Sequence, residues 1–176
     1  MSESSSWTAG RALLLIGRLA LAAVFLYAAY MKLRPALPGP FSMDSLRLSL
    51  SLFATQVDSY QLLPERAVSF VAHTLPFFEL ILGLLLLTGW QLRYFASLTS
   101  ALLLGFFGVM LRSYSKGLEI NCGCFGPGET LGVKTLLRDG SLLALSLAVS
   151  VGAFFRGPAR REEPSIAGAP QPQKAD

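Results

Sequence analysis

Two cysteines, Cys122 and Cys124, lie one residue apart in the stretch NCGCFG. The thiolate is the reactive form of a cysteine, and nearby positive charge favours it. Basic residues lie on both sides of the pair, at Lys116, Lys134 and Arg138. The intervening glycine permits the tight bend that would join the two sulfurs. Such a short-range disulfide should be strained, and strained, exposed disulfides tend to be labile or catalytic. The spacing therefore predicts a redox-active, catalytic dithiol.

Three other interpretations of the two cysteines remain open. They could be buried thiols without a role, or a structural disulfide, although closing so short a loop would stabilise little. A metal site would need about four ligands. The chain offers only the two cysteines and a single histidine, His73. A metal would therefore require a dimer or a partner, and we predict no metal site.

The composition is that of a membrane protein. Of the 176 residues, 52% are hydrophobic and only 15% are charged, against about 25% charged in soluble domains. The net charge of +4 is spread along the chain, which argues against a nucleic-acid partner. A bilayer core needs roughly 20 apolar helical residues. Four stretches qualify: Ala12–Met31, Ala67–Thr88, Leu92–Leu111 and Thr135–Phe155. The sequence thus predicts an all-α membrane protein, a bundle of four transmembrane helices.

The first apolar stretch is interpreted as a retained span. Its apolar core is too long for a signal peptide, and no clean cleavage site follows it. The membrane domain should cover residues 11–156. Residues 1–10 and the Pro-rich tail 157–176 are predicted to be disordered.

A long link joins the first two spans. In it Leu46, Leu50, Phe53 and Val57 share one helical face, which predicts an amphipathic helix on the membrane. The same segment also alternates polar and apolar residues, as a strand would, but its length favours the helix.

Four spans place both termini on one side of the membrane and the cysteine loop on the other. Counting lysines and arginines marginally favours a cytoplasmic cysteine loop. The cluster Arg156, Arg160 and Arg161, directly after the last span, favours cytoplasmic termini. Charge alone leaves both orientations open.

Ionisable residues inside spans are functional candidates. By their distances from the ends of the apolar stretches, Arg18 and Glu79 should lie at similar depth, so an antiparallel helix pair could bring them together. They would then form a packing salt bridge or a proton or quinone site. Alternatively, Arg18 extends alone to the interface.

Two residues near the cysteine loop could support thiol chemistry. His73 could act as a base, or it could be a packing histidine bonded to a backbone carbonyl. Arg138 could favour a thiolate. Its neighbour Asp139 could instead simply stabilise the start of a helix.

Five short stretches occur together in a fixed order. They are MKL at the end of the first span, YQLLP after the long link, LPFFELILGLLLLTG in the second span, CGCFG after the third, and Arg138-Asp139 at the start of the fourth. As a set they resemble the MauE branch of the DoxX-like membrane proteins, which are linked to methylamine utilisation. The resemblance covers roughly residues 12–155.

This resemblance implies a redox-associated four-helix membrane protein with Cys122 and Cys124 as its active pair. The methylamine member is required to mature the disulfide-rich small subunit of methylamine dehydrogenase, beside a thioredoxin-like partner. Other DoxX-like proteins are tied to thiol stress and to quinone-coupled sulfur oxidation. Disulfides persist outside the cytoplasm. We therefore expect a plasma (inner) membrane protein with an extracytoplasmic cysteine loop and cytoplasmic termini.

The function expected on these grounds is thiol–disulfide exchange with a thioredoxin-like or disulfide-bearing extracytoplasmic protein. Quinone is the candidate cofactor, near Glu79 and Arg18. The alternative is a non-catalytic assembly factor or accessory subunit, in which Cys-Gly-Cys is only a turn. A third interpretation, a small transporter or channel, would require an oligomer. Homo- and hetero-oligomers, the client and the direction of electron flow stay open.

Overall fold

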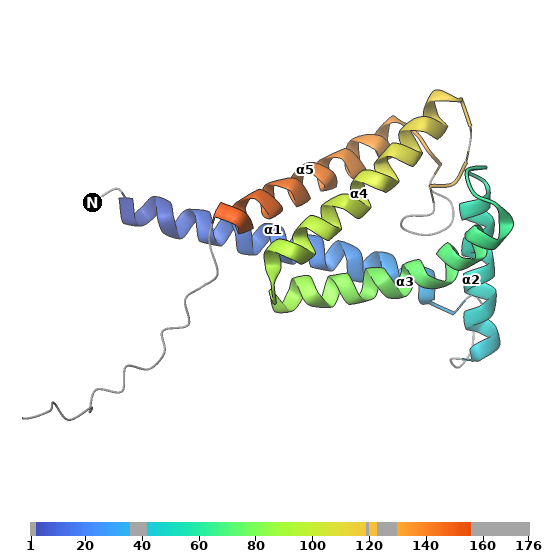
Figure 1. Cartoon of the computed structure of the whole chain (residues 1–176), viewed down its shortest axis with the longest axis horizontal. Helices are drawn as coiled ribbons and strands as arrows, with labels where there is room; N and C mark the ends of the chain where they lie inside the picture. The colour runs from blue at the N-terminus through green and yellow to red at the C-terminus, as the bar shows by residue number, and fades with distance from the viewer. Residues whose placement is uncertain (1–2, 36–41, 119, 123–129, 156–176) are drawn as a thin grey trace, which may run out of the picture.

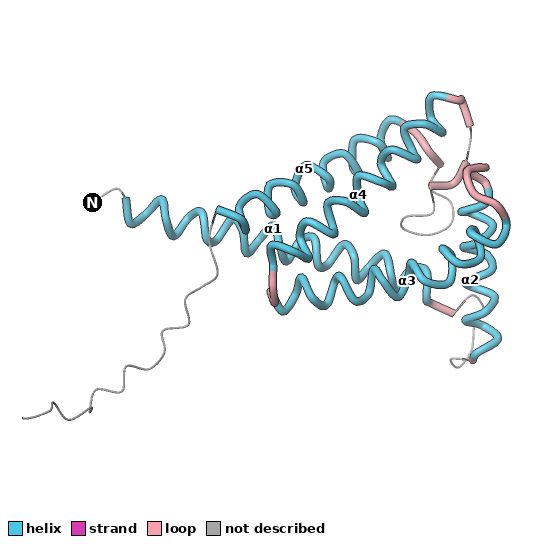
Figure 2. Tube along the Cα trace, viewed as in Figure 1, coloured by secondary structure: helices cyan, strands magenta, loops and turns pink. Residues whose placement is uncertain are grey.

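The computed structural model describes residues 3–35, 42–118, 120–122 and 130–155. Within these residues the chain forms five helices (Figures 1 and 2). They are α1 Glu3–Leu33, α2 Met43–Asp58, α3 Glu65–Thr88, α4 Leu92–Ser115 and α5 Val133–Phe155.

Four of these helices confirm the predicted membrane bundle. The segments Ala12–Leu33, Glu65–Thr88, Leu92–Ser115 and Val133–Phe155 are each long and apolar enough to cross a bilayer. The N-terminus differs from expectation, because α1 begins at Glu3 within the stretch predicted to be disordered. The polar residues before the span contain no proline, so the helix can continue into them. The predicted tail, residues 157–176, lies outside the described residues.

Helix α2 lies across one end of the bundle, at a steep angle to the spans (Figure 1). Its Ser42 cap accepts a hydrogen bond from the Asp44 backbone N–H, which starts the helix. Leu50 and Phe53 are buried, so the predicted amphipathic helix is confirmed and the strand alternative is wrong. Ser49 donates a hydrogen bond of 2.8 Å to the Arg34 carbonyl and so ties α2 to the end of α1.

Helices α1 and α3 pack closely because Gly83 has no side chain. A Cβ at this position would lie 2.8 Å from Cγ of Leu26 and 3.2 Å from the backbone nitrogen of that residue. Small residues at such crossings let membrane helices approach. This close approach is part of the extensive antiparallel packing of α1 on α3. The register of that packing determines which residues of the two helices face each other.

The other helices form a second pair, α4 with α5. Ser100 and Ser150 share a buried hydrogen bond of 3.1 Å between them. A tight turn at Gly89, with φ of +72°, joins α3 to α4. From this turn the two helices diverge towards the α2 end (Figure 1). Helix α3 packs mainly on α1, and α4 mainly on α5. Few contacts therefore close the space between α3 and α4.

We predict that a side chain at Gly83 disrupts the α1–α3 crossing. Gly83→Leu should reduce the free energy of unfolding by about 1–3 kcal/mol, because the α1 backbone cannot move aside. The readout is the thermal unfolding midpoint of the protein purified in detergent. Gly108→Leu on α4 is the matched control, since a Cβ there would find no atom within 4 Å. Equal midpoints for the two variants would contradict this account of the helix crossing.

Candidate functional site at the Cys122 end of the bundle

Cys122 is held in place from both directions along the chain. It is buried and follows Asn121, which forms an isolated antiparallel bridge with Thr130. The Leu131 N–H donates to the Ile120 carbonyl at 2.8 Å. Backbone hydrogen bonds thus join residues 120–121 to residues 130–131, directly next to Cys122.

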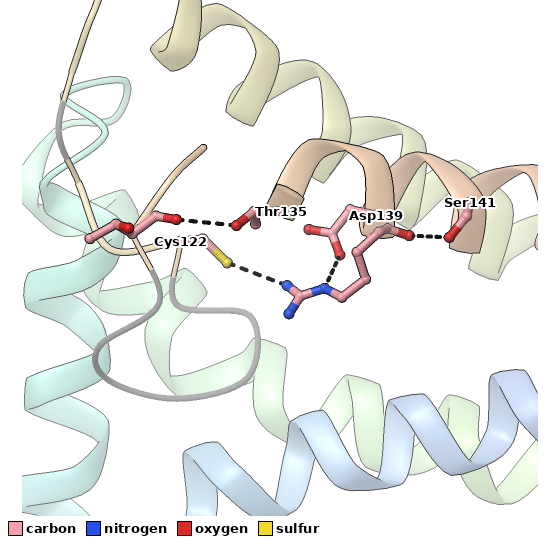
Figure 3. Close-up of polar contacts among 6 residues, drawn as sticks. Cys122, Thr135, Asp139 and Ser141 are labelled. Carbon is pink, nitrogen blue, oxygen red and sulfur yellow. Dashed lines mark hydrogen bonds and ion pairs between the residues drawn. The ribbon is translucent and has the colours of Figure 1, made fainter. Parts of the chain in front are cut away.

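Helix α5 brings a positive charge to the Cys122 sulfur. Thr135, in the first turn, donates a hydrogen bond of 3.1 Å to the Thr130 carbonyl and so anchors the helix to the loop (Figure 3). Nearly one turn later, Nη2 of Arg138 lies 3.9 Å from Sγ of Cys122. Nε of Arg138 donates to Oδ1 of the buried Asp139 at 3.1 Å, which orients the guanidinium. A guanidinium so close to sulfur favours the thiolate.

The backbone of Cys122 is fixed from the link between α2 and α3. The Tyr60 hydroxyl donates a hydrogen bond of 2.8 Å to the Cys122 carbonyl. The cysteine also packs in a cluster with the buried Met110 and Leu131. Cys124 lies outside the described residues. The disulfide expected between it and Cys122 therefore stays a prediction.

A second charged group crosses the bundle near the same end. Lys32 of α1 donates to both carboxylate oxygens of Glu79 in α3, at 2.9 and 2.8 Å. Both side chains are almost fully buried. The Lys32 ammonium also lies 5.3 Å from the centre of the Phe53 ring in α2, a cation–π distance. One ion pair thereby links three helices.

The predicted approach of Arg18 to Glu79 is wrong. The register of α1 on α3 places Lys32 opposite Glu79. It places Arg18 opposite Gly89, where a Cβ would collide with the guanidinium. The prediction measured depth from the ends of the apolar stretches and treated Lys32 as a residue beyond the span. The overlooked signal was the lysine within MKL, directly at the end of that stretch.

His73 is not brought to the cysteine. Its side chain is exposed on α3, and its Nδ1 lies 2.7 Å from the Ser69 carbonyl one turn earlier. Because a carbonyl can only accept, Nδ1 carries the proton. The backbone bond expected of a packing histidine is therefore present, and the predicted role as a base receives no support from the geometry.

An apolar cavity of about 480 Å³ connects the ion pair with the thiol. All five helices contribute to its wall. The few polar lining residues include Lys32, Glu79, Gln56, Tyr60 and Cys122. A small, mostly apolar space with a few convergent polar groups is typical of ligand sites. The arrangement brings together a thiol, a proton-carrying ion pair and room for a hydrophobic molecule.

A comparison with protein families matches residues 10–153 to the model described as methylamine utilisation protein MauE. The chain belongs to the MauE family. Neither the curated proteins nor the solved structures contain a significant match. The MauE match covers α2, almost all of the four spans and the whole segment that carries Cys122 and Arg138. The site described above thus lies within the part of the chain that defines the family.

The Lys32–Glu79 pair predicts a strongly non-additive mutant cycle. Lys32→Met or Glu79→Leu alone should reduce the free energy of unfolding by about 3–5 kcal/mol, because each leaves one buried charge without its partner. The double variant should recover most of this loss, since two apolar side chains of similar size need no partner. Thermal unfolding of the four proteins in detergent measures the cycle. Additive losses would mean that the two residues do not act as a pair.

Arg138 is predicted to activate the Cys122 thiol. In a Cys124→Ser background, Arg138→Gln should slow alkylation of Cys122 at neutral pH about tenfold, equivalent to about 1.4 kcal/mol. Glutamine keeps a donor for Asp139, so the loop should stay in place. Lys134→Gln removes an exposed charge from the same helix and is the control. Alkylation with a small membrane-permeant maleimide gives the rates. Similar rates in both variants would show that Arg138 has no specific effect.

Proposed function

We propose that this MauE-family chain is a membrane thiol–disulfide oxidoreductase that oxidises a protein client on the extracytoplasmic side. The observation that carries the proposal is the Arg138 guanidinium 3.9 Å from the buried Cys122 sulfur. A thiol that served only for packing would need no adjacent, oriented charge. The second cysteine two residues later supplies the other half of a dithiol.

The two cysteines have different roles in this proposal. Cys122 is only 4% exposed, so a folded client cannot reach its sulfur directly. We assign the first contact with the client to Cys124. Cys122 then acts as the internal sulfur, which leaves from the disulfide and later restores it.

The bonds and electrons in this exchange balance without an external oxidant or reductant. A client thiolate attacks Sγ of Cys124 in the Cys122–Cys124 disulfide, and Cys122 leaves as a thiolate beside Arg138. A second client thiolate then attacks the client sulfur of the mixed disulfide, and Cys124 leaves. The client gains one disulfide, and the membrane protein holds two reduced sulfurs. A leaving group departs faster when its thiolate is stabilised, which is the contribution of Arg138.

The client class follows from family membership. MauE proteins are named for methylamine utilisation, and the disulfide-rich small subunit of methylamine dehydrogenase is a protein that requires such oxidation. A thioredoxin-like protein could carry the disulfide between them. Since disulfides persist outside the cytoplasm, the proposal places the α2 end of the bundle on the extracytoplasmic face. The wider relation to DoxX-like redox proteins is part of the same proposal.

Single cysteine variants should separate the two roles. With a client that already carries its disulfide, Cys124 of the Cys122→Ser protein should attack the client disulfide and accumulate as a mixed disulfide, because no internal sulfur is present to displace the client. Cys124→Ser should form none. Both variants should abolish client oxidation in cells. Non-reducing gels and mass mapping of the linked peptides provide the measurement, with Ser113→Ala as a control outside the site. Full client oxidation by both cysteine variants would leave a non-catalytic assembly factor as the function.

A further inference from the structure

The cavity opens on the lipid-facing side of α4. Ala101 and Gly105 lie one turn apart, and both are exposed while lining the cavity. Gly105 is near the middle of the span Leu92–Ser115, and a Cβ there would find no atom within 4 Å. At this depth acyl chains rather than water surround a spanning helix. A ligand that uses this opening must therefore come from the bilayer.

The body of the cavity fits an apolar ring system. Its volume of about 480 Å³ lies in the range of about 300–1,000 Å³ that is usual for small-molecule sites. Phe25, Leu75, Leu102 and Phe106 are among its walls. Side chains of this kind stabilise a hydrophobic ligand by burying its apolar surface and by packing closely against it.

The polar groups in the cavity wall indicate which chemical groups the other end of the ligand should carry. The charge of Lys32 is balanced by Glu79, and that of Arg138 by Asp139. The wall therefore has no surplus positive charge for a phosphate-bearing cofactor. It does hold a hydrogen-bond donor, the side-chain amide of Gln56, in the same wall as Lys32 and Cys122. A neutral head group that accepts hydrogen bonds matches this end.

We propose that the cavity binds a membrane quinone, which accepts the electrons of the reduced cysteine pair. The inference rests on the proposed function for its redox partner. The dithiol of Cys122 and Cys124 loses two S–H bonds and gains one S–S bond. Two electrons and two protons pass to the two carbonyl oxygens of the quinone, which becomes a quinol. The Lys32–Glu79 pair at the wall can hold and relay a proton at Nζ or the carboxylate.

A lipid acyl chain is the competing occupant, and the wall argues against it. An acyl chain forms no hydrogen bonds, yet the cavity exposes a buried ion pair and a thiol to its occupant. Ionisable groups at membrane depth are costly and usually mark a pathway for protons, ions or substrates. A quinone head group presents polar carbonyl oxygens to this part of the wall, and its isoprenoid tail can pass through the opening at Gly105.

The test measures binding of decylubiquinone to the full-length protein in lipid nanodiscs. After equilibration and removal of excess quinone, bound quinone is extracted and quantified, with protein-free nanodiscs as the baseline. Gly105→Leu places a side chain in the opening and should reduce quinone binding about tenfold. Gly108→Leu, also open on α4 but not a lining residue, should bind as the unmodified protein does. Leucine is a better helix former than glycine, so neither substitution should impair folding.

Two results would overturn the quinone site. One is equal binding by the Gly105→Leu and Gly108→Leu proteins. The other is binding by the unmodified protein that does not exceed the nanodisc baseline, which would mean that acyl chains fill the cavity. The mixed disulfide with the client is measured separately, so the quinone site and the thiol exchange can fail independently. Quinone binding without any client mixed disulfide would reject the thiol exchange alone. A mixed disulfide without quinone binding would reject the quinone site alone.

Discussion

The close crossing of α1 and α3 at Gly83 is the constraint on which the site depends. Because a glycine faces Leu26 there, the two helices can approach closely at this point of their antiparallel contact. The register of this contact brings Lys32 to Glu79 in the interior. It also brings Arg18 to the turn at Gly89, whose positive φ favours glycine and beside which the flexible guanidinium lies. The packing of α1 on α3 thus determines the position of both Lys32 and Arg18.

The ion pair is better explained by the cavity than by stability. Two charges in a low-dielectric interior lose hydration free energy, and their mutual attraction barely compensates for this loss. Apolar residues would therefore hold α1 and α3 together at least as well. Lys32 also contacts the ring of Phe53, and it lines the same cavity as Cys122. Lys32 and Glu79 are costly to bury in a membrane, link three helices and line an internal cavity, which supports the proposal that their charges have a function.

Periodicity and length predict the helices but not the partners of the charges. The four spans and the amphipathic α2 follow from apolar stretches of sufficient length and from Leu50 and Phe53 on one face. The pairing of Glu79 depends on how far α1 slides along α3, which their whole interface decides, including the close contact at Gly83. Depth counted from the ends of apolar stretches does not contain that information. Arg138 lies 3.9 Å from the Cys122 sulfur because the Asn121–Thr130 bridge and the hydrogen bond from Thr135 to Thr130 hold the start of α5 against the cysteine segment. Its effect on the thiol stays a prediction.

The divergence of α3 and α4 makes the site accessible from two directions, one at Gly105 and one at the loop that carries Cys122. The short turn at Gly89 holds these helices together at one end, while α1 and α5 draw them apart towards the other. The resulting space meets lipid at Gly105 and meets the thiol at Cys122. The segment that carries Cys122 is tied by Tyr60 to the α2 side of the bundle and by Thr130 to α5. A client approaching the loop and a hydrophobic molecule from the bilayer would therefore reach the same cysteine pair from different directions. This separation is what a protein needs if it is to pass electrons from an aqueous partner to a membrane-soluble one.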